Sequence, residues 1–336
     1  MFRQIIQIYS AIHNDLGQIV VVCPYPLNHN LYLISNKIKI IFKRYLCSHG
    51  NSTVFVLDDQ PYIEKIKIQI DNLDAGYFNL HKFESYKGLT LMSIIVRNED
   101  EYIIQWIEYH LILGIDKFII YDNSGNKNDN PSSGNLLGKG KNSNLYVLLS
   151  NYVDSGRVII LDWPFDEKFQ ETHQNHSIWA FKSAKYIGFF DVDEYINPQM
   201  NDFYIPEILD QYLMKNKLNF NEIGGLRFAN RFFYNPFNFD DTGYNFLSIY
   251  ITDFKFIFDR GKSFIMPSNV NCYSVHEISN GEKWIDVDYH VIYFNHYFFL
   301  NKSKRGRSIF NFTLKRDKSI KRYLKMLQKK EIQLGQ

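Results

Sequence analysis

Residues 187–196, with the sequence IGFFDVDEYI, join a short apolar run to two aspartates that stand one residue apart. The apolar run predicts a buried strand. A tight bend after such a strand can direct the carboxylates of Asp191 and Asp193 toward one small volume. Hard, anionic oxygen ligands of this kind suit Mg²⁺ or Mn²⁺. An isolated pair of this type is more often an acidic surface turn, so its meaning depends on the rest of the chain.

The composition indicates a packed globular protein, because 17% of the 336 residues are aromatic. The formal net charge is only +2, so no overall field favours nucleic acid or an acidic membrane surface. No stretch reaches the roughly 18 to 20 apolar residues that a spanning helix needs, and the N-terminus is a poor signal peptide, which favours a cytoplasmic protein. Cys23, Cys47 and Cys272 lack metal-type spacing and predict neither a disulfide framework nor a zinc site.

Three regions differ in their sequence pattern. Residues 1–86 contain short β-branched runs between turn residues and predict a β-rich N-terminal subdomain without a catalytic cluster. Residues 87–300 begin with apolar runs that alternate with helical repeats. The predicted strands cover residues 91–96, 117–121, 157–163 and 187–190, and the predicted helices begin near Asn98, Leu145 and Asp166. This order predicts an α/β fold with a mostly parallel, Rossmann-like nucleotide-binding sheet. Residues 301–336 are basic and predict a C-terminal helical tail.

Polar residues follow the first two of these strands. Arg97, Asn98 and Glu99 end the first strand, and Asp122 and Asn123 end the second. Because parallel strands place their carboxyl ends at one edge of a sheet, both groups are expected near the aspartate pair. They can bind a nucleotide base and ribose, although Asn98 can equally be a helix N-cap and Asp122 a turn residue. The chain has neither a G-x-G-x-x-G nor a Walker-type motif, which favours a metal-held sugar nucleotide over dinucleotide redox chemistry.

Three segments carry a resemblance to a known family. They are SIIVRNEDEYIIQWIEYHLILGIDKFIIYDNS at 93–124, YVDSGRVIILDWP at 152–164 and HQNHSIWAFKSAKYIGFFDVDEYINP at 173–198. Together they resemble glycosyltransferase family 92 and its family 2-like relatives, and the likeness continues more loosely through KSFIMP, VHE and NHY farther along the chain. The resemblance implies the A-type glycosyltransferase fold, a nucleotide-sugar donor that is commonly UDP-galactose, a glycan or glycoprotein acceptor, and Mn²⁺ or Mg²⁺.

The resemblance also implies roles for individual positions. The residues expected to bind the nucleotide are Arg97, Asn98, Glu99, Asp122, Asn123 and Asp191. Asp191 and Asp193 would be the metal pair, and His276 would supply a third metal or diphosphate contact. An inverting transfer also needs a general base, and the candidates are Asp240, Asp241 and Glu277. Residues 227–236, RFANRFFYNP, depart from the family pattern, so the specificity of the family is not carried over.

Four neighbouring residues receive simpler interpretations. Glu194 is expected to point away from its neighbours and to support the turn without binding metal. His296 lies in an aromatic run and is expected to be a packed core histidine. His173 and His176 have a spacing that could bind metal, but a helix face is the simpler explanation.

Two alternatives to a glycosyltransferase remain. A haloacid-dehalogenase-type phosphatase also places two aspartates after an apolar strand and binds Mg²⁺. That motif favours a small residue where Tyr195 stands, and it usually follows the first strand of the sheet, whereas three strands come before it here. The other alternative is a non-catalytic carbohydrate-binding protein on the same scaffold.

Overall fold

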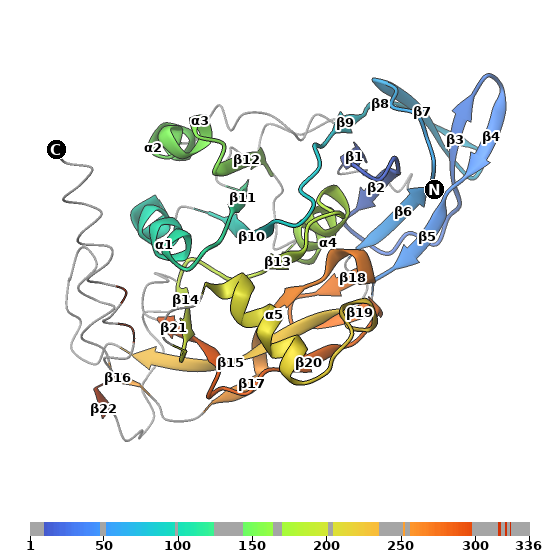
Figure 1. Ribbon diagram of the computed structural model, residues 1–336. Coiled ribbons are helices and arrows are strands. Elements are labelled where there is room, and N and C mark those ends of the chain that lie inside the picture. Colours follow the sequence, from blue (N-terminus) through green and yellow to red (C-terminus); the bar gives the residue numbers. More distant parts are fainter. Residues whose placement is uncertain are drawn as a thin grey trace.

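The computed structural model describes most of the chain up to residue 297. The described residues are 10–47, 52–97, 100–123, 144–163, 170–200, 204–234, 251–252 and 256–297, together with 315–316, 320 and 323. Figure 1 shows the N-terminal strands in blue at one side of the molecule, beside α4 and β18. The larger sheet and the remaining helices make up the rest of the described structure.

Four parallel strands form one end of the large sheet. They are β10 (Thr90–Val96), β11 (Lys117–Asp122), β12 (Val158–Asp162) and β13 (Tyr186–Gly188). Their order is β12-β11-β10-β13, so the chain first moves outward from β10 and then crosses back to its other side. Such a reversal opens a crevice at the carboxyl ends of β10 and β13, where open α/β sheets bind their ligands. The strands that the apolar runs predicted are therefore present.

The C-terminal strands extend this sheet with a different geometry. They are β14 (Glu194–Pro198), β15 (Gly225–Tyr234), β16 (Ile251–Thr252), β17 (Ile257–Ile265), β20 (Trp284–Asp286), β21 (Ile292–Tyr297) and β22 (Lys315–Arg316). β17 lies antiparallel to both β13 and β15, while β21 pairs antiparallel with β14 and parallel with β15. The described sheet is thus mixed, and the prediction of a mostly parallel sheet holds only for its first four strands.

The predicted C-terminal helical tail falls largely outside the described residues. Within it the structure describes β22, which pairs antiparallel with β16. No helix among the described residues combines the length and the apolar character that crossing a membrane requires.

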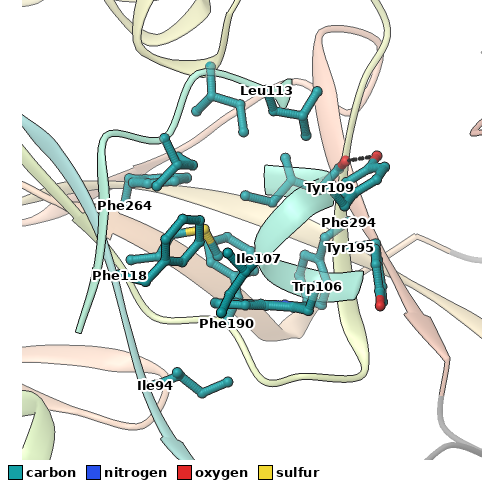
Figure 2. Packing of buried hydrophobic residues seen from close by; sticks show 14 of the residues in the cluster. Ile94, Trp106, Ile107, Tyr109, Leu113, Phe118, Phe190, Tyr195, Phe264 and Phe294 are labelled. Carbon is teal, nitrogen blue, oxygen red and sulfur yellow. Dashed lines mark hydrogen bonds between the residues drawn. The ribbon is translucent and has the colours of Figure 1, made fainter. Parts of the chain in front are cut away.

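Helix α1 (Asp100–Ile112) covers the parallel strands and fixes the strand that follows the aspartate pair. Its buried Trp106 and Ile107 pack with Phe118 and Phe190 in the main core (Figure 2). The indole nitrogen of Trp106 donates to the carbonyl oxygen of Glu194 at 3.0 Å. The helix ends where expected, since Gly114 adopts a φ of +86° that side chains other than glycine rarely accept.

The remaining helices are short. They are α2 (Asn144–Leu148), α3 (Ser150–Asp154), α4 (Gln170–Ala180) and α5 (Ile205–Lys215). The single helix predicted from Leu145 to Val153 is divided into α2 and α3. The helix predicted from about Asp166 corresponds to α4, whose described part begins at Gln170.

The N-terminal region consists of two packed sheets. One has the order β5-β6-β2-β1-β9 and the other β4-β3-β7-β8. Their strands are β1 (Ser10–His13), β2 (Ile19–Cys23), β3 (Leu31–Ser35), β4 (Ile38–Ile41), β5 (Lys43–Leu46), β6 (Thr53–Leu57), β7 (Lys65–Ile70), β8 (Leu73–Asn79) and β9 (His81–Lys82). Val21 and Phe55 of the first sheet share a core cluster with Leu33 and Ile68 of the second. The sequence therefore predicted the β-rich character of this region correctly.

Helix α4 binds the hairpin of β18 (Val270–Ser274) and β19 (Glu277–Gly281) through side chains. Asn175 and Trp179 lie one turn apart on α4, and Lys182 lies in the turn that follows the helix. Their partners are the backbone of Tyr273 for Asn175 (2.8 and 3.0 Å), the carbonyl of Asn271 for Trp179 (2.9 Å) and the carbonyl of Val270 for Lys182 (2.6 Å). A helix thus takes the place of a neighbouring strand along this edge of the hairpin.

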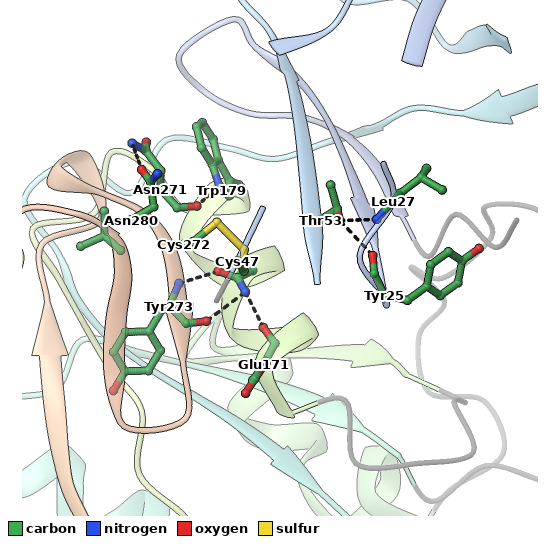
Figure 3. Close-up of a disulfide and its surroundings, with 12 residues drawn as sticks. Tyr25, Leu27, Cys47, Thr53, Glu171, Trp179, Asn271, Cys272, Tyr273 and Asn280 are labelled. Atoms are coloured by element: carbon green, nitrogen blue, oxygen red, sulfur yellow. Dashed lines mark hydrogen bonds between the residues drawn. A yellow bond between two sulfur atoms is a disulfide. The ribbon is translucent and has the colours of Figure 1, made fainter. Parts of the chain in front are cut away.

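A disulfide between Cys47 and Cys272 ties the same hairpin to the N-terminal region (Figure 3). The two residues are 225 positions apart in sequence and their Cα atoms are 5.2 Å apart. The cysteine spacing predicted no disulfide framework, and this single disulfide was missed because folding brings together residues whose separation in sequence carries no signal. Cys23 remains a buried thiol.

Reduction of this disulfide should destabilise the protein. The crosslink closes a very long loop, so losing it is expected to lower the free energy of unfolding by about 2–4 kcal/mol. Thermal unfolding with and without dithiothreitol measures the effect, and the Cys47→Ser/Cys272→Ser variant should be insensitive to the reductant. Denatured, unreduced protein should titrate one thiol. Three thiols, or a melting temperature that the reductant leaves unchanged, would contradict the crosslink.

Candidate metal and donor site

The chain leaves β13 beside β10 and turns sharply before it enters β14. Gly188 permits this close packing, because a Cβ atom there would lie 2.6 Å from the ring of Phe264 on β17. The backbone N–H of Glu194 donates to the carbonyl of Asp191 at 2.9 Å. The Glu194 carboxylate in turn accepts the backbone N–H of Asp191, also at 2.9 Å. Glu194 therefore closes the turn and keeps its carboxylate beside that of Asp191.

A lysine from β17 lies between two of the acidic side chains. The ammonium of Lys262 is 2.8 Å from Oδ2 of Asp191 and 3.3 Å from Oε2 of Glu194. The side chains of Lys262 and Glu194 are only 4% and 2% exposed, whereas that of Asp191 is 39% exposed. Gln170 of α4 donates to the other oxygen of Asp191 at 3.4 Å. Asp191 is thus the member of the group that stays accessible to solvent.

A histidine from β21 joins the other carboxylates. Nε2 of His296 lies 3.4 Å from Oδ2 of Asp193, and its Nδ1 lies 3.7 Å from Oε1 of Glu194. This position follows from the register of the strands, in which Glu194 is directly opposite His296. The amide of Asn230 on β15 donates to Nδ1 of His296 at 3.4 Å, and the ring of Phe232 lies beside the imidazole.

Burial changes the acidity of this group. It raises the pKa of Glu194 to about 7, while Lys262 and His296 act in the opposite direction and Asp191 and Asp193 add to the rise. Burial alone would lower the pKa of Lys262, but the adjacent carboxylates of Asp191 and Glu194 raise it above its ordinary value. The site therefore contains an ammonium that stays charged and a carboxyl group that changes its charge near neutral pH.

Asp193, Glu194 and His296 can hold a metal ion together. Each offers one ligand atom, these atoms all lie within 4.8 Å of one another, and all three residues are buried. Carboxylate and imidazole ligands suit Mn²⁺, and Mg²⁺ accepts the carboxylates. The residues present therefore fit the ion that the sequence led us to expect. The expected ligands were Asp191, Asp193 and His276, whereas the structure groups Asp193 with Glu194 and His296.

The residues expected to bind the nucleoside lie at the ends of neighbouring strands. Arg97 is exposed at the end of β10, and Asp122 is buried at the end of β11. Asn123 joins the strand ends, since its backbone N–H donates to Val96 at 2.9 Å and its side chain donates to the carbonyl of Trp163 at 2.6 Å. Asn98 and Glu99 lie outside the described residues.

Of the site residues expected from later segments, the structure describes His276 and Glu277. His276 lies in the turn between β18 and β19, and its Nδ1–H donates to the carbonyl of Gly261 at 3.2 Å. His276 thus contacts the residue that precedes Lys262. Glu277 follows His276 at the start of β19. Asp240 and Asp241, the other candidate bases, lie outside the described part of the chain.

Two histidines on α4 are packed inside the protein. His176 hydrogen-bonds the hydroxyl of Tyr121 at 2.7 Å and that of Ser10 at 3.1 Å, and burial lowers its pKa to about 3. The ring of His173 lies against Tyr121 and Phe189, and burial lowers its pKa to about 3 as well. The interpretation of this pair as a helix face is in agreement with the structure.

Comparison with known proteins assigns the family. Residues 139–331, more than half of the chain, match the sequence profile of glycosyltransferase family 92. This chain belongs to glycosyltransferase family 92. The matching region includes the turn of Asp191 and Asp193, as well as Lys262 and His296, but it begins after the β10–β11 unit.

Curated members of family 92 share low identity with the chain. A family 92 protein of Ricinus communis is 21% identical over 210 residues, which are 60% of this chain and 34% of that protein. One of Oryza sativa subsp. japonica is 23% identical over 210 residues, which are 60% of this chain and 32% of that protein. The chain thus matches about a third of the length of these relatives. Among solved structures, the apo form of the bifunctional glycosyltransferase WbbM aligns with a TM-score of 0.27 and 9% identity, covering 49% of this chain and 26% of that one.

Three residues lie beside the aspartates in ways that the sequence did not show. Glu194 supports the turn as predicted, but its carboxylate does not point away from its neighbours, because a turn and not an extended strand precedes it. His296 is packed against Phe232 as predicted, and its ring also contacts the acidic group. Lys262 was only part of a quoted motif. The sequence signals for His296 and Lys262 were the NHY and KSFIMP segments that contain them. Only the register of the strands shows that both side chains lie beside the acidic turn.

The stability of the metal-free protein should depend on pH through Glu194. Its folded-state pKa is raised from 4.5 to about 7, so the folded state binds the proton more tightly than the unfolded state does. The stability from this group is present below its unfolded pKa and is lost as the pH rises through about 7. Denaturant unfolding in EDTA should therefore show that wild type loses stability relative to Glu194→Gln across this interval. A difference that stays constant, or grows in favour of wild type, would contradict the assignment.

Proposed function

We propose that this chain transfers a sugar from a nucleotide sugar, with a UDP-linked donor as the best candidate, to a hydroxyl of a glycan or glycoprotein, with the help of Mn²⁺ or Mg²⁺. The observation that carries the proposal is the buried group of Asp193, Glu194 and His296, which follows β13 where the strand order of the sheet reverses. Membership of family 92 supports the reaction class. The order β12-β11-β10-β13 supports an A-type glycosyltransferase arrangement of the nucleotide-binding strands.

The acidic residues divide the work in this proposal. Asp193, Glu194 and His296 would hold the ion, and a bound Mn²⁺ or Mg²⁺ would supply Lewis-acid stabilisation of the negative charge on the departing nucleoside diphosphate. Asp191 contacts the donor, because its carboxylate is the most exposed of the group and remains at the mouth of the turn. His276, in the adjacent hairpin, lies close enough in the fold to Lys262 to serve the diphosphate.

The nucleoside would bind along the ends of β10 and β11. Asp122 and Asn123 offer acceptors for ribose hydroxyls and the base, and Arg97 offers a cation near the phosphates. Asn98 and Glu99 belong to the same proposed pocket. The carboxyl ends of parallel strands, near the point where the strand order reverses, are the usual place for such a ligand.

The transfer is proposed to invert the anomeric centre in one displacement. The acceptor hydroxyl attacks the anomeric carbon as the bond to the diphosphate breaks, and a carboxylate takes the hydroxyl proton. Glu277 is the candidate base that the structure describes, at the start of β19 beside His276. Asp240 and Asp241 are the other candidates for this role.

Removing one ligand should abolish the metal-dependent response to UDP. UDP with Mn²⁺ should raise the melting temperature of wild type, since a ligand at 100 times its Kd adds about 2.7 kcal/mol of stability. Asp193→Asn should remove this shift, and Asp74→Asn, a matched change in the exposed part of β8, should keep it. A shift of the same size in EDTA would contradict the metal assignment.

Turnover with a panel of UDP- and GDP-sugars identifies the reaction and the donor. Release of nucleoside diphosphate that requires Mn²⁺ or Mg²⁺ is the expected result, with UDP-galactose among the first donors to test. Release of inorganic phosphate from phosphomonoesters, with no cleavage of any nucleotide sugar, would favour a phosphatase. Binding of glycans without any turnover would favour a non-catalytic protein.

A further inference from the structure

Lys262 occupies an unusual position for a lysine. Its side chain is 4% exposed and its ammonium bridges Asp191 and Glu194 at 2.8 and 3.3 Å. The backbone of β17 is held on both sides, by β13 and by β15, where Lys262 is opposite Phe228. The base of the side chain is therefore fixed in the centre of the sheet. Buried lysines are rare unless they are paired, so this pairing is a built feature of the site.

The formal charges of the group show what the lysine does. Asp191, Asp193 and Glu194 bring three negative charges, and Lys262 brings one positive charge. With a neutral His296, which metal binding requires, the sum is −3 + 1 = −2. One divalent ion therefore neutralises the group. Without the ammonium the sum would be −3, and Asp191 would have lost the contact that holds its Oδ2 atom.

The ammonium also competes with the ion for the same carboxylate. Glu194 offers Oε1 toward His296, whereas its Oε2 faces Lys262 and the backbone N–H of Asp191. The two oxygens of one carboxylate are thus divided between the proposed metal ligands and the lysine. The ammonium of Lys262 and the divalent ion would lie on opposite sides of Glu194 and would repel each other. The lysine therefore limits how tightly the ion binds.

We propose that Lys262 is a positioning residue that keeps Asp191 apart from the metal ligands for contact with the donor and that weakens the binding of the divalent ion by charge repulsion. The inference rests on the proposed function, because it assumes that Asp193, Glu194 and His296 bind a divalent ion. It adds a residue that touches neither the ion nor the reacting atoms and acts through the carboxylates. A lysine that only fills space in the sheet would affect folding stability and would leave ion affinity unchanged or lower.

Titration calorimetry with Mn²⁺ alone tests this role. Lys262→Met removes the charge and keeps most of the side-chain volume, and it should lower the Kd for Mn²⁺ on the order of tenfold, from the lost repulsion between neighbouring cations. Lys262→Arg keeps the charge and should bind Mn²⁺ with an affinity near that of wild type. Lys185→Met is the matched control, since Lys185 pairs with Asp210 on α5 and not with the site.

A second variant separates charge from structure and covers the case in which Lys262→Met does not fold. Lys262→Met/Asp191→Asn restores the formal charge of −2 without changing Asp193, Glu194 or His296. It should regain stability and return the Kd for Mn²⁺ toward the wild-type value. Catalysis gives an independent measure, because Lys262→Met should lower kcat with the donor although it binds the ion more tightly.

The outcomes distinguish this inference from the proposed function. Wild type that binds no Mn²⁺, or binds it equally well after Asp193→Asn, would overturn the metal site itself. Wild type that binds Mn²⁺ through Asp193, together with a folded Lys262→Met whose Kd is unchanged or higher, would overturn only the role of Lys262. A double variant whose Kd stays as low as that of a folded single variant would overturn the charge argument as well.

Discussion

Three carboxylates within four residues need positive charge beside them to remain ionised in a buried turn. Lys262 of β17 supplies this charge and contacts Asp191 and Glu194, while His296 of β21 contacts Asp193 and Glu194. Much of the C-terminal half of the sheet can be understood from this requirement. β17 must lie beside β13, and β21 beside β14, for these side chains to reach the turn. The antiparallel strands of the mixed sheet thus carry the two side chains that contact the acidic turn at the end of the parallel strands.

Other elements hold the surroundings of this turn in place. Trp106 of α1 fixes the start of β14, and side chains of α4 and of the turn that follows it hold the backbone of β18. The disulfide from Cys47 anchors the same hairpin to the N-terminal sheets. The hairpin carries His276 and Glu277, and His276 contacts the carbonyl of Gly261, the residue before Lys262. The N-terminal region is therefore linked to the site through its attachment to this hairpin.

The sequence predicted the parallel strands well because each one is a continuous apolar run, and burial on both faces imposes that pattern locally. It also predicted the turn that carries Asp191 and Asp193, while the metal role of Asp193 stays a prediction. It could not show Lys262 or His296 as partners, because their pairing depends on strand register across long separations, 71 residues in the case of Lys262 and Asp191. Glu194 was misjudged because alternation along a strand was assumed where the chain turns. The disulfide was missed for the same reason as the lysine: sequence spacing carries no record of contacts between distant segments.

The central claim is that an imidazole and two carboxylates, buried behind the turn, bind the divalent ion. Pulsed electron paramagnetic resonance of protein-bound Mn²⁺ tests it directly, because it detects a nitrogen atom bound to the metal. The account predicts this nitrogen signal in wild type and in His276→Ala, and predicts its loss in His296→Ala. A signal that disappears in His276→Ala and persists in His296→Ala, or one that is absent from Mn²⁺-loaded wild type, would contradict the account.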